Sequence, residues 1–190
     1  GVTGSVGKTS TKEMIASVLA QKYKVHKTLG NFNNEWGLPI TLFAMPEDTE
    51  VAILEMGINH FGEMRRLSSV SCPDICVITN IGIAHLEFLK TREGILQEKT
   101  EMIKDMKEGG SILLNGDDDL LSTVGERNGV MPQFFGIGDN NSFYAATYPF
   151  TDNLSYSNWF ILFFFRHINS SFLLKKIHCT MYLFLYSCTT

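Results

Sequence analysis

The sequence lacks several features that mark whole classes of protein. Its 190 residues include four cysteines, too few for the disulfide framework of a small secreted domain in a chain of this length. We expect no signal peptide, and no apolar run reaches the roughly 20 residues of a membrane span. The net charge of −4 argues against nucleic acid as the main partner. We therefore expect a cytoplasmic protein with buried, reduced thiols, no membrane span and no nucleic-acid partner.

Acidic residues, glycine, alanine, valine and proline are all absent after Asp152. The stretch 148–190 is instead crowded with Phe, Tyr, Leu, Ser and Asn, without clear alternation of apolar and polar positions. Its run 159–165 could form a buried strand. We nevertheless place a boundary at 147/148 and interpret 148–190 as an atypical, non-native tail from a shifted reading frame or a damaged gene. Such a tail would be aggregation-prone if expressed.

A glycine-rich turn opens the chain, with glycines at positions 1, 4 and 7 followed by Lys8 and Thr9. Glycine lets successive N–H groups point at one anion, and a following helix adds the positive end of its dipole. The spacing is a variant of the usual phosphate-binding loop, because Val2 stands where its first glycine belongs. A turn that merely caps a helix is the alternative. The residues expected to bind the phosphates of ATP are Gly4, Ser5, Val6, Gly7, Lys8, Thr9 and Ser10.

Apolar runs of strand length alternate with segments of helical periodicity up to residue 147. Strands are predicted at 23–28, 51–56, 75–79, 111–115 and 133–137, and helices at 9–22, 39–45, 61–70, 91–106 and 117–127. This alternation predicts an α/β domain with a mostly parallel sheet flanked by helices. Ligands of such sheets bind at the carboxyl ends of strands, where Glu55, Asn80 and Asn115 are expected. A phosphate-binding loop normally follows a strand, so we expect the chain to be truncated within one at its start.

Three residues beyond the turn are candidates for chemistry, and each has a plainer alternative. Glu55 ends an apolar run, as an acid that holds Mg²⁺ does, or it is a solvated carboxylate. His85 follows the next strand and is a metal ligand, a substrate contact or a structural residue. Lys99 stands among glutamates, a pattern that favours a solvated helix face. Three asparagines of the loop after residue 30 are either turn formers or polar substrate contacts: Asn31, Asn33 and Asn34.

Six motifs follow one another in an order that resembles the Mur ligases of peptidoglycan synthesis. They are the turn 3–12, the asparagine-rich loop 30–39, and the segments 55–60, 80–87, 98–101 and 114–118. The asparagine-rich loop and the Gly-x-Asn-His of 57–60 are similar to the type of Mur ligase that joins D-alanyl-D-alanine to UDP-N-acetylmuramoyl-tripeptide. The resemblance covers about residues 1–145. It implies most of a central ATPase domain, without the UDP-binding and C-terminal domains of the family.

The resemblance also implies a reaction. The γ-phosphate of ATP would pass to a substrate carboxylate, and the amine of D-alanyl-D-alanine would attack the acyl phosphate. By resemblance Lys8 stabilises the transferring phosphoryl group, and Thr9 and Glu55 hold Mg²⁺. His85 and a Lys99 carbamoylated by CO₂ would join Glu55 at a second Mg²⁺, which reverses the interpretation of Lys99 from its neighbours. The implied substrate contacts are Asn31, Asn33, Asn34, Asn59 and His60.

Alternative functions stay open at this point. One is an ATP-binding module without ligase activity, and another is a different Mur-type ligase. A third, a kinase, is disfavoured because it has no need of the motifs around Asn59 and Lys99. We expect the fragment alone to be inactive, because catalysis depends on positioning by the substrate-holding domains.

Overall fold

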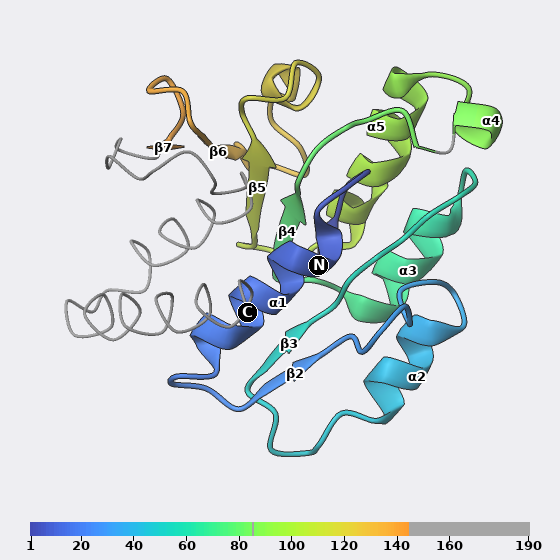
Figure 1. Cartoon of the computed structure of the whole chain (residues 1–190), viewed down its shortest axis with the longest axis vertical. Helices are drawn as coiled ribbons and strands as arrows, with labels where there is room; N and C mark the ends of the chain where they lie inside the picture. The colour runs from blue at the N-terminus through green and yellow to red at the C-terminus, as the bar shows by residue number, and fades with distance from the viewer. Residues whose placement is uncertain (85, 145–190) are drawn as a thin grey trace, which may run out of the picture.

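The computed structural model of the chain describes residues 1–84 and 86–144 (Figure 1). Its elements follow in the order β1 (Val2–Thr3), α1 (Lys8–Leu19), β2 (Val25–Lys27), α2 (Gly37–Phe43), β3 (Val51–Ile53), α3 (Glu63–Ser71), β4 (Ile75–Ile78), α4 (Leu86–Leu89), α5 (Arg92–Thr100), η1 (Glu101–Asp105), β5 (Ser111–Asn115), η2 (Leu121–Thr123), β6 (Gln133–Gly136) and β7 (Phe143–Tyr144). The α/β class is confirmed. The boundary at 147/148 and the tail lie outside the described residues.

Every strand pair in the described part of the chain is parallel. One sheet has the order β1-β4-β5-β6-β7, and β2 pairs with β3 in a second. The two sheets meet at Val2, whose N–H donates to Leu54 O at 2.8 Å and whose carbonyl accepts from Met56 N at 2.9 Å. The chain after β3 therefore lies beside β1, and the strand order reverses around β1. In open parallel sheets this reversal point is where ligands bind.

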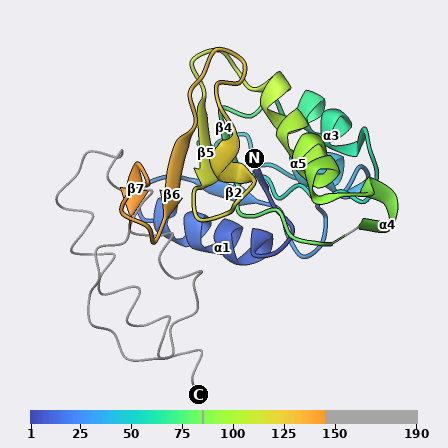
Figure 2. The same cartoon turned by 90° about the horizontal axis from the view of Figure 1, so that it is seen from above.

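Helices cover both faces of the sheet (Figure 2). On one face Ile15 and Leu19 of α1 pack with Val77 of β4 in an apolar cluster. On the other, α3, α5 and η1 pack on a larger cluster that includes Ile78 and Leu114. Neighbouring residues of one strand point to opposite faces, so β4 contributes to both cores, as its unbroken apolar sequence predicts.

The helix predicted over 117–127 is wrong. Only the short 3₁₀ turn η2 forms there, because the acidic side chains at the start of the segment bind backbone N–H groups of other loops. Asp117 Oδ1 accepts from Gly138 N at 3.1 Å, and Asp118 Oδ2 accepts from Ile81 N at 2.8 Å. Such side-chain bonds compete with helix formation.

Other differences are smaller. The helix predicted over 91–106 is α5 continued by the 3₁₀ helix η1, and neither α4 nor β7 was predicted. No helix among the described residues is both long and apolar enough to cross a membrane.

The two cysteines of the described region are unpaired thiols, as predicted. Cys76 is buried in β4, and burial raises the pKa of its thiol to about 11, so the group stays protonated. Cys72 is exposed at the end of α3, so the prediction that it is buried is wrong.

Candidate functional site

The glycine-rich turn connects β1 to α1 and needs glycine at two positions. Gly4 has φ +151°, and a Cβ there would lie 1.9 Å from Thr79 Oγ1. Gly7 has φ +80° and borders open space. A side chain at Gly4 would therefore collide with the end of β4, whereas one at Gly7 would only strain the backbone.

The end of β4 holds this loop in place. The side-chain oxygen of Asn80 accepts from Ser5 N at 3.0 Å and from Val6 N at 2.9 Å. Thr79 Oγ1 donates to Val6 O at 2.7 Å, and Gly82 N donates to Ser5 Oγ at 2.8 Å. Asn80 therefore lies beside the loop, as its predicted place at a strand end requires.

The start of α1 leaves backbone donors open. Within the described residues, the N–H groups of Gly7, Lys8 and Thr9 make no hydrogen bond. Gly7 and Thr9 are exposed, so these donors face solvent at the positive end of the helix dipole. The arrangement suits a phosphate group.

Lys8 lies over the same loop. Its Nζ donates to Gly4 O at 3.0 Å and to Ser5 O at 3.4 Å. Partial burial lowers the pKa of Lys8, and the nearby Glu55 carboxylate opposes that effect. The loop thus carries a cation that can exchange its carbonyl partners for phosphate oxygens.

Glu55 is 2% exposed, so the alternative of a solvated carboxylate is wrong. Its Oε1 accepts from Thr9 Oγ1 at 3.1 Å and from Asn33 Nδ2 at 2.8 Å. Its Oε2 is buried and accepts no hydrogen bond from the described residues. A buried carboxylate oxygen without a donor beside a threonine hydroxyl is a suitable pair of hard ligands for Mg²⁺.

No group of three or more His, Cys, Asp or Glu side chains among residues 1–84 and 86–144 could hold a metal. Among these residues, Glu55 and Thr9 are the candidate ligands at the glycine-rich turn. This fits Mg²⁺, which commonly keeps several waters and binds one or two carboxylates together with substrate phosphates.

Lys99 is 2% exposed in α5, so the solvated face favoured by its neighbours is wrong. Burial, together with the positive charge of Lys8, lowers the pKa of Lys99 to about 7, although the Glu98 carboxylate opposes both effects. The buried Glu98 Oε1 accepts from Met64 N at 2.8 Å, at the start of α3. No hydrogen-bond or ion-pair partner of the Lys99 amine lies in the described part of the chain.

The predicted substrate residues are distributed unevenly around this site. Asn33 contacts Glu55, whereas the Asn34 side chain accepts from Trp36 N and Gly37 N at the start of α2. Three others have exposed side chains: Asn31, Asn59 and His60. The His60 ring lies 4.2 Å from that of Phe88. His85 lies outside the described residues.

Lys12 was missed by the sequence reasoning. It is 1% exposed, and its Nζ lies 2.6 Å from Thr28 O, 3.1 Å from Glu13 Oε1 and 3.6 Å from Glu55 Oε2. A signal was present, because Lys12 lies three and seven positions before Ile15 and Leu19, on the apolar face of the helix. A lysine in an apolar stripe indicates a buried partner.

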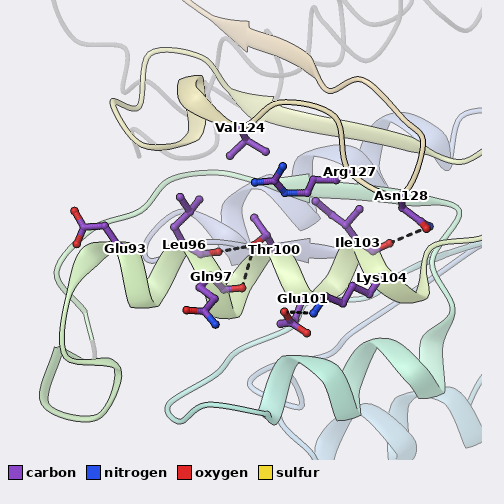
Figure 3. Close-up of a pocket in the computed structure, with 10 residues that line it drawn as sticks. All are labelled: Glu93, Leu96, Gln97, Thr100, Glu101, Ile103, Lys104, Val124, Arg127 and Asn128. Atoms are coloured by element: carbon purple, nitrogen blue, oxygen red, sulfur yellow. Dashed lines mark hydrogen bonds and ion pairs between the residues drawn. The ribbon is translucent and has the colours of Figure 1, made fainter.

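A separate cavity of about 480 Å³ lies between α5, η1 and the segment 124–128 (Figure 3). None of the predicted site residues lines it. It is lined by Glu93, Leu96, Gln97, Thr100, Glu101, Ile103, Lys104, Val124, Arg127 and Asn128. The site around Glu55 and the glycine-rich turn is therefore distinct from this cavity.

Comparison with known sequences finds one family over most of the chain. Residues 2–172 match the Mur ligase middle domain. A UDP-N-acetylmuramoyl-tripeptide–D-alanyl-D-alanine ligase of Bacillus subtilis is 49% identical over 143 residues, which is 75% of this chain and 31% of that protein. The enzyme of the same name from Synechocystis is 42% identical over 127 residues, 67% of this chain and 28% of that protein. The chain thus spans about a third of the length of these curated relatives.

Comparison with known structures finds the same family. MurF from Acinetobacter baumannii superposes with a TM-score of 0.66 at 34% identity, covering 72% of this chain and 30% of that one. The MurF ligase from Thermotoga maritima in complex with ADP also gives a TM-score of 0.66, at 41% identity, covering 72% of this chain and 32% of that one.

Proposed function

The chain belongs to the Mur ligase middle-domain family, and from this premise we propose that it is the ATP-binding part of a cytoplasmic peptidoglycan-precursor ligase. The enzyme would join D-alanyl-D-alanine to UDP-N-acetylmuramoyl-tripeptide, the reaction that names both curated relatives. The observation that carries the proposal is the contact of 3.1 Å between Glu55 Oε1 and Thr9 Oγ1, beside the open N–H groups of the glycine-rich turn. This geometry supports a Mg²⁺-nucleotide site.

The reaction divides between two steps. The γ-phosphoryl group of ATP moves to the substrate carboxylate, ADP leaves, and an acyl phosphate forms. The amine of D-alanyl-D-alanine then attacks the acyl carbon, phosphate leaves, and the amide loses a proton. The open N–H groups and Lys8 would hold and neutralise the phosphates in the first step.

Thr9 and Glu55 would hold Mg²⁺, which supplies positive charge against the phosphate oxygens when bound. The buried Glu55 Oε2, which no described residue donates to, supports this assignment. A second Mg²⁺ would use Glu55, His85 and a carbamoylated Lys99.

Carbamoylation of Lys99 needs a neutral amine to attack CO₂, with loss of one proton. An ordinary lysine is almost fully protonated at neutral pH, whereas Lys99 has a pKa lowered to about 7 by burial. Mass spectrometry after chemical trapping of the carbamate should show the adduct on Lys99. An unmodified Lys99 in protein saturated with CO₂ would refute the proposal.

The substrate would approach from the side of the asparagine-rich loop and of 57–60. Asn33 links that loop to Glu55, so a substrate bound there would lie near the metal. The exposed Asn31, Asn59 and His60 are available for polar contacts with the muramoyl-peptide, with Asn34 at the start of α2. The remaining domains of the full enzyme would supply the other contacts.

A phosphate-release assay tests the proposal. Residues 2–144 should replace the matching region of the Bacillus subtilis relative, and the chimera should release phosphate only with ATP, Mg²⁺, UDP-N-acetylmuramoyl-tripeptide and D-alanyl-D-alanine together. Lys8→Ala and Lys99→Ala should each abolish release. A chimera that binds ATP without substrate-dependent release would favour a nucleotide-binding module. The 190 residues alone should bind nucleotide without turnover, and robust turnover would contradict that expectation.

A further inference from the structure

We propose that Lys12 is a positioning residue whose buried ammonium group orients the Glu55 carboxylate for metal binding. The proposal rests on the proposed function of Glu55 as a Mg²⁺ ligand. Lys12 does not lie at the nucleotide loop itself. It lies one helical turn further along α1, where its Nζ is 3.6 Å from Glu55 Oε2.

The contacts of Lys12 connect three parts of the chain. Its ammonium donates to Thr28 O at 2.6 Å and contacts Glu13 Oε1 at 3.1 Å. The hydroxyl of the same Thr28 accepts a hydrogen bond from Glu55 N at 2.9 Å. Lys12 and the Glu55 backbone are thus fixed to one residue, which is fully buried just after β2. This arrangement sets the distance between the ammonium and the carboxylate.

The geometry leaves Glu55 balanced in charge but incompletely hydrogen-bonded. Lys12 Nζ lies 3.6 Å from Glu55 Oε2, close enough for strong attraction at a buried site but without a hydrogen bond. Oε1 is already fixed by Thr9 and Asn33. Lys12 therefore supplies the countercharge that a buried carboxylate needs, while the lone pairs of Oε2 stay available to a cation.

The alternative is a purely structural lysine that joins Glu13 to Thr28. Glu13 is 40% exposed and also pairs with Lys27, so it does not depend on Lys12 alone. Lys27 offers a matched control, because it pairs with the same Glu13 but forms no hydrogen bond or ion pair with Glu55.

A stability cycle tests the coupling between Lys12 and Glu55 in the 190-residue chain. Lys12→Met should lower the melting temperature by about 10 °C, because it leaves the Glu55 charge buried and unpaired. Lys12→Met combined with Glu55→Gln should recover most of that loss. If Lys12→Met fails to fold, folding of the double variant supports the proposal. A double variant as unstable as Lys12→Met alone would overturn it, because Lys12 would then act through Thr28 and Glu13.

Metal-dependent nucleotide binding tests the positioning role. ADP affinity should be measured with and without Mn²⁺, the probe for Mg²⁺, for wild type, Lys12→Met and Lys27→Met. In Lys12→Met the metal-free affinity should stay within about threefold of wild type, while the tightening caused by Mn²⁺ should fall at least tenfold. In Lys27→Met the tightening caused by Mn²⁺ should be the same as in wild type. Equal tightening in Lys12→Met and wild type would overturn the proposal. Failure of wild type to bind ADP would count against the proposed function, while the stability cycle would still decide the coupling.

Discussion

The charge states of single residues in this site depend on their burial and on the charged groups nearby. Lys8 lies near enough to Lys99 for its positive charge to lower the pKa of Lys99, and Glu55 lies near Lys8. An exposed lysine would stay protonated at neutral pH, but the pKa of Lys99 is lowered to about 7. In the proposed site, a cation that would bind phosphate and a carboxylate that would bind a metal are thus combined with an amine that is neutral in an appreciable fraction of molecules.

Lys99→Met should remove a pH dependence of stability. The folded chain releases the Lys99 proton near pH 7, but the unfolded chain releases it near 10.4. The unfolded state therefore binds more protons between these values, and the free energy of unfolding of wild type should rise with pH by up to about 1.4 kcal/mol per unit relative to Lys99→Met. Urea unfolding of both chains from pH 7 to 9 in CO₂-free buffer measures this. A difference that does not change with pH would contradict the lowered pKa.

Gly4→Ala should destabilise the chain more than Gly7→Ala. The new Cβ would lie 1.9 Å from Thr79 Oγ1 and 3.2 Å from the Asn80 backbone N, whereas at Gly7 nothing lies within 4 Å. Backbone strain alone is expected to cost about 1–2 kcal/mol at Gly7, and the collision should add about 1–3 kcal/mol at Gly4. Thermal unfolding of the two variants gives the comparison. Equal losses would mean that the loop does not pack on β4 as described.

Among the elements, β1 and α1 flank the glycine-rich turn, and the segment after β4 holds it in place. The residues just after β4 fix the backbone of this turn through the Asn80 side chain. Arg92 of α5 in turn donates to Ile81 O at 3.0 Å, and this bond holds the same segment from the other side. We therefore expect nucleotide affinity to depend on residues that need not touch the nucleotide.

Asn80→Ala should weaken ADP binding by about 10- to 100-fold, because it removes the shared acceptor of two backbone N–H groups at about 0.5–1.5 kcal/mol each. Titration calorimetry measures the affinity, and the melting temperature of the same sample serves as the control. Wild-type affinity in Asn80→Ala would show that the loop holds its shape without this side chain.

Much of the site could be predicted because its signals are local. The glycines, Lys8 and Thr9 adjoin one another, and Glu55 ends an unbroken apolar run. Burial of Lys99 could not be read from its neighbours, because Glu98 is satisfied by the start of α3, which is distant in sequence. For the same reason the helix predicted over 117–127 failed: its acids bind loops that the local pattern does not reveal.

Over the whole molecule, the strand order places the site. The residues after β3 lie beside β1, and β1 pairs with β4. Glu55, the glycine-rich turn and Asn80 therefore meet at the carboxyl ends of these strands. Three segments far apart in sequence thereby form one site. All described residues assigned to that site belong to residues 4–99.

A chain that ends at residue 147 should bind ADP with the affinity of the 190-residue chain. The last strand of the described residues is β7, and the composition of 148–190 predicts that this tail adds nothing to the site. Titration calorimetry of both chains compares the affinities, and light scattering should show less aggregation for the shorter one. A more than tenfold loss of affinity on truncation would contradict the expected boundary at 147/148.

Binding of Mg²⁺ with a non-hydrolysable ATP analogue to the 190-residue chain tests the central claim most directly. Titration calorimetry should show one binding site per chain. Binding should be lost in Lys8→Ala, and in Glu55→Gln it should persist but no longer depend on the metal. It should be unchanged in Lys22→Ala, which alters an exposed lysine beyond α1. Absence of binding, or equal binding by Lys8→Ala and wild type, would contradict the assignment of this turn and Glu55 as the nucleotide site.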